Sequence, residues 1–201
     1  MPTRSWKTWT LALLTASLCS TAAARSAEIV VSVKDQTITV VDDGKRKAEF
    51  PISTSKFGLG DSIRSFRTPT GAFSVERKIG DRLPAGAVLK GLRFTGEVLR
   101  PDAPGRDTIV TRVLCLRGLE SSNRNAAARG IYIHGTPEER SIGKPASYGC
   151  IRMRSRDVIA LFDSVPVGTR VVITDLPPSK LLASSTTAAA KSDPHGDDWF
   201  R

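Results

Sequence analysis

The stretch IYIHGTPEERSIGKPASYGCIRM, residues 131–153, decides how this sequence is interpreted. Residues 131–133 are β-branched and aromatic, so they predict a short strand that ends at His134. A thiol, Cys150, follows in the same stretch. An imidazole can take the proton of a nearby thiol, and the thiolate–imidazolium pair that results performs acyl transfer. The stretch therefore predicts a nucleophilic cysteine site next to a β-strand.

Small residues flank both groups, as a crowded acyl-transfer site requires. Gly135 follows the histidine, and Ser147 and Gly149 precede the cysteine. Glycine lets the backbone approach a substrate closely and lets amide groups face a developing oxyanion. On composition alone a purely structural histidine and an inert buried cysteine stay open. A metal site is not expected, because the sequence lacks HxxH, CxxC and HExxH spacings.

The sequence on either side predicts a mainly β domain over residues 28–176, either a β-sandwich or a mixed sheet, with one or two short helices. The predicted strands are residues 28–33, 37–41, 45–53, 73–79, 109–116 and 170–174, together with 131–133. Ser155 is expected to cap a helix over residues 156–164, and residues 124–129 are expected to form one helical turn. Residues 80–108 are rich in Gly, Pro and charge, which predicts a long irregular segment.

The two ends of the chain differ from this domain. Residues 1–24 combine a short basic start, a short apolar middle and Ala22-x-Ala24, which is typical of a secretory signal peptide. We therefore expect an exported protein of the periplasm or cell envelope. Residues 177–201 are dominated by Pro, Ser, Thr and Ala, which predicts a flexible C-terminal tail.

Charge limits the possible partners. The 201-residue chain carries a net charge of +10, but its basic residues are dispersed and only 6% of residues are aromatic. Nucleic-acid binding is not expected, because basic and aromatic residues do not alternate along any segment. A basic exported protein can instead lie against anionic wall polymers or lipid headgroups.

With these motifs in place, the sequence resembles the L,D-transpeptidase catalytic domain family, the YkuD-like cysteine enzymes of bacterial walls. The resemblance rests on His134-Gly135, on Ser147-Tyr148-Gly149-Cys150 with Arg152 two places later, and on the element at 68–73 that matches TPxGxF. Residues 157–161 and 167–171 match the closing helix and GTxV strand of the family. Tyr148 departs from the pattern, since His, Arg or Asn is commoner there.

The resemblance implies a peptidoglycan L,D-transpeptidase that uses no metal and no organic cofactor. Cys150 would attack the stem tetrapeptide after its third residue and release D-alanine, with His134 as general base and acid. The carbonyl of Gly135 would orient the imidazole, and the amides of Gly149 and Cys150 would be oxyanion-hole candidates. An amine of a second stem would then accept the acyl group in a 3→3 crosslink.

The remaining implied roles are less specific. Ser147, Tyr148 and Arg152 would line the site, with Arg152 either holding a stem carboxylate or bracing the loop. Three alternatives stay open: water as acceptor, giving an L,D-carboxypeptidase or crosslink amidase; a lipoprotein lysine as acceptor; or a catalytically silent wall-binding domain. Carbapenems are expected to trap Cys150 covalently. Cys115 is expected to be buried, with a disulfide to Cys150 as the alternative.

Overall fold

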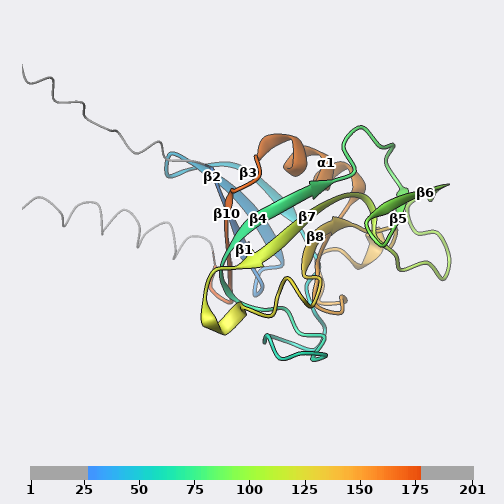
Figure 1. The fold of residues 1–201 in the computed structure, drawn as a ribbon. Coiled ribbons are helices and arrows are strands. Elements are labelled where there is room, and N and C mark those ends of the chain that lie inside the picture. Colours follow the sequence, from blue (N-terminus) through green and yellow to red (C-terminus); the bar gives the residue numbers. More distant parts are fainter. Residues whose placement is uncertain (1–26, 178–201) are drawn as a thin grey trace, which may run out of the picture.

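The computed structural model describes residues 27–177, so the predicted signal peptide and all but the first residue of the predicted tail lie outside the described residues. Ten strands and one α-helix occur in this range (Figure 1). The strands are β1 (Glu28–Ser32), β2 (Thr37–Asp42), β3 (Lys45–Pro51), β4 (Gly71–Ile79), β5 (Ala87–Lys90), β6 (Arg93–Val98), β7 (Val110–Gly118), β8 (Tyr132–Gly135), β9 (Ile151–Met153) and β10 (Arg170–Thr174). Helix α1 spans Ser155–Ser164, and two 3-10 turns cover Ser121–Asn123 and Glu139–Ser141.

The strands form one mixed sheet in the order β3-β2-β1-β10-β4-β7-β5-β6, and β7 also pairs with β8, which pairs with β9. The pairings β1–β10 and β8–β9 are parallel, whereas the other strand pairs are antiparallel. The expectation of a mainly β domain with a mixed sheet and few short helices is therefore confirmed. Within residues 27–177 no helix is long and apolar enough to cross a membrane.

One hydrophobic core contains residues from the first strands of the domain and from its last helix and strand. Alternate residues of β1, β2, β4, β7 and β10 point to one side, where α1 packs against β7 and β8 (Figure 1). Phe73, Leu114, Ile133 and Leu161 are fully buried in this cluster. Helix α1 turns the apolar face predicted for it toward the core, and it holds β8 and the residues after it in place.

Two local predictions were wrong. Residues 80–108 contain the hairpin β5–β6, which we expected to be irregular, and this hairpin projects from the rest of the sheet in Figure 1. Arg154, not Ser155, is the N-cap of α1, because the Ser155 hydroxyl lies 2.8 Å from that of Thr111 on β7. The single helical turn expected over residues 124–129 is present, since the amide of Arg129 donates to the carbonyl of Asn125 at 2.9 Å, and a 3-10 turn at Ser121–Asn123 precedes it.

Candidate active site

Parallel pairing of β8 and β9 brings the two reactive side chains together. In the register of these strands His134 lies opposite Arg152, and Cys150 is the residue immediately before β9. Side chains two residues apart on a strand share a face, so Cys150, Arg152 and His134 are presented on the same side. All three line one cavity of about 240 Å³, together with Tyr148 and residues 107–109.

The imidazole of His134 is held by the backbone next to it. Its Nδ1 lies 2.9 Å from the carbonyl oxygen of Gly135. Because a carbonyl only accepts hydrogen bonds, Nδ1 carries the proton in the neutral ring and Nε2 is left as the acceptor. Burial lowers the pKa of His134 to about 4, although the Gly135 carbonyl acts in the opposite direction. The ring is therefore a neutral base at pH 7, with its accepting nitrogen defined.

A glycine is required at position 135 for a separate reason, which is its close contact with β7. A Cβ atom at this position would lie 2.6 Å from the carbonyl oxygen of Val110 and 3.2 Å from side-chain atoms of Thr111 and Val158. Real side chains do not fit so close to a backbone atom. The glycine is needed for close packing of β8 on β7, and its carbonyl remains free to orient the imidazole.

The thiol of Cys150 lies in a half-buried position at the entry to β9. It donates a hydrogen bond to the carbonyl oxygen of Gly130, at 3.3 Å. Burial raises the pKa of the Cys150 thiol, and a hydrogen bond from the backbone amide of Tyr132 opposes this rise. The resting site therefore holds a neutral thiol and a neutral imidazole, so the thiolate–imidazolium pair has to form during reaction.

The loop before Cys150 is fixed by its own polar groups. The Ser147 hydroxyl donates to the carbonyl of Cys150 at 2.6 Å and accepts from the amide of Gly149 at 3.2 Å. Gly149 has φ +122°, a region that favours glycine, and its carbonyl accepts from the Thr68 hydroxyl at 3.1 Å. The Gly149 amide is thus used inside the loop. The described residues provide no acceptor for the Cys150 amide, which leaves it available to an oxyanion.

Arg152 is anchored below the cavity by two carboxylates. Its side chain is 5% exposed, with Nη2 2.6 Å from Asp107 and Nη1 3.6 Å from Glu138. Nη1 is buried and has no hydrogen-bond partner among residues 27–177. Of the two roles considered for Arg152, bracing is visible in these contacts.

Tyr148 occupies the mouth of the cavity and is half-exposed. Lys56 donates a hydrogen bond from Nζ to the Tyr148 hydroxyl at 3.0 Å, and the same Nζ lies 4.4 Å from the centre of the ring. A cation in this position is attracted to the face of the ring. The unusual residue of the motif is therefore connected to a segment about ninety residues earlier in the chain.

That earlier segment, residues 53–68, is hereafter the anchored loop. Asp61 and Arg129 form an ion pair at 2.9 Å whose two side chains are each 6% exposed. Asn125 donates to Asp61 from its backbone amide, and Arg129 also donates to the carbonyl of Gly60. These contacts tie the loop to the turn that contains Gly130, the hydrogen-bond acceptor of the Cys150 thiol.

Several residues around the cavity have no motif that could reveal them. Asp107 and Thr108 line it but belong to the segment that we expected to be irregular, and Ile109 lines it from the start of a predicted strand. Thr68 begins the element that matches TPxGxF, and its hydroxyl supports Gly149. Cys115 is buried on β7, as expected, and its thiol and that of Cys150 are both free. Among the described residues, no three His, Cys, Asp or Glu side chains are grouped to hold a metal ion.

In this mixed β-sheet an oriented imidazole on β8 and a thiol just before the parallel strand β9 line one cavity. The chain is therefore a β domain with a cysteine–histidine site. Residues 26–173 match the family model described as the YkuD L,D-transpeptidase catalytic domain. The chain belongs to this family.

A curated relative agrees with this assignment, and solved structures are similar to the chain in fold. The chain is 33% identical over 147 residues to the putative L,D-transpeptidase YqjB of Bacillus subtilis, which covers 73% of this chain and 70% of YqjB. Bd1075 of Bdellovibrio bacteriovorus shares the fold, with TM-score 0.52, 14% identity, and coverage of 86% of this chain and 58% of that chain. A structure of L,D-transpeptidase 3 from Mycobacterium tuberculosis with a faropenem-derived adduct gives TM-score 0.49 and 20% identity over 75% of this chain and 60% of that chain.

Proposed function

We propose that this protein is a peptidoglycan L,D-transpeptidase that forms 3→3 crosslinks. Cys150 attacks the carbonyl carbon of the third residue of a tetrapeptide stem, and the terminal D-alanine leaves. An amine of a second stem then takes the acyl group. Membership of the L,D-transpeptidase family supports the reaction class, and the cavity shared by Cys150 and His134 supports the assignment of roles.

The proposed proton transfers follow from the orientation of His134. As Sγ of Cys150 bonds to the carbonyl carbon, its proton passes to Nε2, the nitrogen left free by the Nδ1 contact with Gly135. The carbonyl oxygen becomes an oxyanion, which the Cys150 amide is placed to stabilise. Nε2 then protonates the amine of D-alanine as the C–N bond breaks, leaving a thioester. The acceptor amine reverses these steps and loses its proton to Nε2 before the thiol is restored.

The neutral resting pair suits this order of events. A thiol that is neutral at pH 7 is less easily oxidised or captured by stray electrophiles than a permanent thiolate. Deprotonation is coupled to attack, so it takes place only when a carbonyl occupies the cavity. The single observation on which this proposal depends most is that His134 presents Nε2, and not Nδ1, as its free acceptor.

The deciding experiment uses the mature protein, residues 25–201, and a Cys150→Ala control, each incubated with disaccharide-tetrapeptide. We expect a crosslinked dimer that has lost one D-alanine, detected by mass spectrometry and absent from the control. Disaccharide-tripeptide as the sole product would make water the acceptor, as in an L,D-carboxypeptidase. Transfer only to a lysine-bearing peptide would favour lipoprotein attachment, and no product with any donor would contradict enzymatic activity.

We also propose that carbapenems acylate Cys150. The strained β-lactam carbonyl is a stronger electrophile than a stem amide, and no leaving amine can diffuse away because the opened ring stays attached. Incubation with meropenem is expected to raise the intact mass by one drug molecule. A Cys150→Ala variant, which has no nucleophile at this position, should keep its mass, and an equal rise in its mass would place the modification elsewhere.

The proposed site of action is the cell envelope. Residues 1–24 have the composition of a secretory signal, and the substrate proposed above lies outside the cytoplasm. Export is tested by fusing residues 1–30 to a reporter that folds only after secretion. A reporter that stays in the cytoplasm would contradict it.

A further inference from the structure

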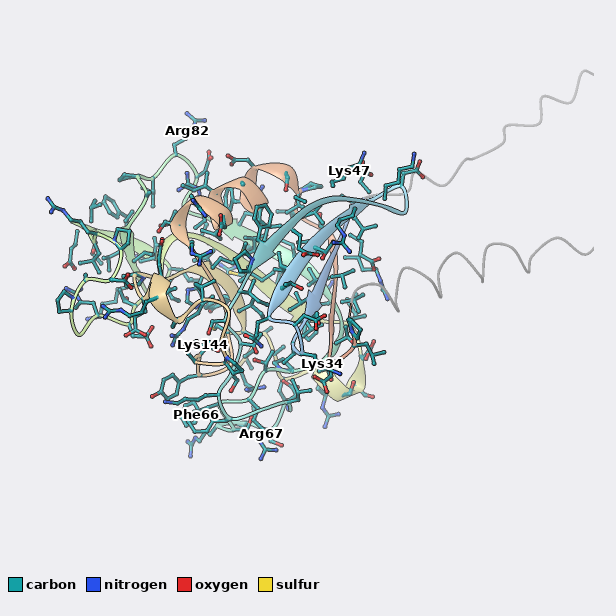
Figure 2. The ribbon with its side chains drawn as sticks, turned by 180° about the vertical axis from the view of Figure 1, so that it is seen from behind. Lys34, Lys47, Phe66, Arg67, Arg82 and Lys144 are labelled. Carbon is teal, nitrogen blue, oxygen red and sulfur yellow. The ribbon has the colours of Figure 1, made fainter. Side chains whose placement is uncertain are left out.

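Three aromatic side chains gather on the surface beside the cavity. Phe57, Phe66 and Tyr148 have ring centroids 5.5 to 6.0 Å apart, and they are 45%, 53% and 52% exposed. Large apolar side chains that are grouped and exposed mark interaction sites more often than isolated ones do. We call this group the aromatic platform. Figure 2 shows Phe66 beside Arg67 at one end of the molecule, on the anchored loop.

The platform is held in shape before any ligand binds. Phe66 has φ +56°, which is unfavourable for a bulky residue, and its carbonyl accepts a 2.6 Å hydrogen bond from the Ser55 hydroxyl. The buried Asp61–Arg129 ion pair fixes the same loop. Strain that surrounding contacts maintain is characteristic of functional positions. The rings meet at 43°, 54° and 90°, so they present several faces and edges instead of one flat surface.

The platform is continuous with the catalytic cavity through Tyr148, which belongs to both. A substrate whose carbonyl lies at Cys150 can therefore extend past Tyr148 to the other two rings. Three extended residues span about 10 Å. The Phe57 and Phe66 rings lie one ring spacing beyond Tyr148, so a group joined to the stem about three residues before the attacked carbonyl can reach them.

We propose that the aromatic platform is a subsite for the sugar rings of the glycan strand that bears the donor stem. This inference rests on the proposed function, since it identifies which further part of the peptidoglycan substrate is bound. One face of a pyranose ring carries C–H bonds and packs against aromatic rings through apolar burial and dispersion. Lys56 and the Tyr148 hydroxyl provide polar groups at the edge, as hydroxyl and acetamido oxygens of a sugar require.

A lipid surface is the other kind of partner that aromatic and basic residues attract. The cavity argues for the sugar. Tyr148 stands at the mouth of the cavity, so a bilayer on the rings would cover the entrance to Cys150. A glycan strand on the rings would instead leave its own stem directed into the cavity.

The experiment compares two donors, disaccharide-tetrapeptide and free tetrapeptide, and measures kcat/KM for each. Phe57→Ala, Phe66→Ala and Phe66→Leu are tested against Phe94→Ala, a matched control on β6 with a Phe of 43% exposure. The wild type is expected to prefer the disaccharide donor about tenfold, and each platform variant should lower that ratio toward one. Phe94→Ala should keep the wild-type ratio. Equal loss on both donors, or an unchanged ratio, would overturn the subsite.

A binding measurement separates this inference from the proposed function. Tri-N-acetylchitotriose is titrated calorimetrically into the Cys150→Ala protein, with and without Phe66→Ala. Binding that Phe66→Ala abolishes supports the subsite even where no donor is turned over, in which case the proposed function alone fails. Turnover without any sugar binding overturns the subsite and leaves the proposed function standing. Sedimentation with phosphatidylglycerol vesicles that Phe66→Ala abolishes would assign the rings to a membrane and overturn the subsite.

Discussion

Two segments contact the residues that form the cavity, and they are held in different ways. The anchored loop, residues 53–68, is fixed by the buried Asp61–Arg129 ion pair and by Thr68, which supports Gly149. In the hairpin segment, residues 80–108, the ion pairs of Arg106 with Glu97 and of Arg140 with Asp102 are exposed to solvent, and only Asp107 at its end pairs with a buried partner, Arg152. Both segments have charged contacts of similar length. The burial of the ion pair, and not its presence, therefore distinguishes the two segments. We call the anchored loop the rigid segment and the hairpin segment the adaptable one.

The two segments contribute differently to the site. The anchored loop holds the thiol in position through the turn that contains Gly130. The hairpin segment contributes Asp107 and Thr108 to the cavity. Under the proposed function the site accepts first a donor stem and then an acceptor stem, and an adaptable segment beside a fixed one would accommodate both.

The strongest test of the comparison removes the charge of Asp61. Asp61→Asn keeps the shape of the side chain but leaves the buried Arg129 guanidinium without its counter-charge. We expect a loss of about 3 kcal/mol in the free energy of unfolding, which lowers Tm by about 6–12 °C for a domain of this size. Thermal unfolding measures it.

The matched control is Asp102→Asn in the hairpin segment, where the partner Arg140 is exposed. It should leave Tm unchanged. Equal effects of the two variants would show that burial does not distinguish the two segments.

A second test measures how the free energy of unfolding depends on pH through His134, which lies on β8. Burial lowers the pKa of His134 to about 4 from its ordinary value of 6.5, so the unfolded chain binds a proton that the folded chain excludes. Stability from this group is complete above pH 6.5 and is lost as pH falls toward 4. At pH 4.5 the loss is expected to be about 2.5 kcal/mol.

Urea unfolding at pH 7.0 and pH 4.5 measures this loss. Carboxylates titrate in the same range, so the contribution of His134 is the difference between the wild type and His134→Gln. If the two proteins lose the same stability on acidification, the imidazole is not excluded from protonation by burial.

The smallest effect is expected in the hairpin segment. Glu97→Gln removes the charge that Arg106 contacts at 2.7 Å, and the exposed pair should contribute no measurable global stability. Amides of β6 should nevertheless exchange hydrogen faster in this variant, whereas the amides of Gly60 and Thr68, which bond across the anchored loop, should not change. Hydrogen exchange followed by mass spectrometry checks both. Faster exchange in the anchored loop as well would show that the two segments are coupled.

Much of the sheet could be predicted from the sequence because its strands alternate or are continuously β-branched. Strands β1, β2 and β10 are of this kind, and each was predicted within about one residue. The hairpin β5–β6 could not be predicted, since every residue of β6 is exposed and no buried face imposes a period on the sequence. The Ser155 cap failed for a related reason: its hydroxyl partner, Thr111, lies on β7, and local rules do not include it.

The two residues to which we assign the reaction could be predicted from the sequence, whereas the residues around them could not. His134 and Cys150 have characteristic neighbours, and the structure places both on one cavity. The platform partners of Tyr148, Phe57 and Phe66, belong to no motif, because their proximity depends on how the anchored loop folds back. Exposed aromatic residues in a loop were the one available signal, and position along the chain could not show that they meet.

The backbone contact of His134 has a consequence for how this site can change by mutation. In a Ser-His-Asp arrangement the group that orients the histidine is a side chain, which one codon change can delete. Here it is the main-chain oxygen of Gly135, which every amino acid possesses. Substitution at 135 cannot remove that oxygen and would instead disturb the packing on Val110. Under the proposed mechanism, a single substitution can therefore delete the imidazole of His134 or the thiol of Cys150, but not the group that orients the imidazole.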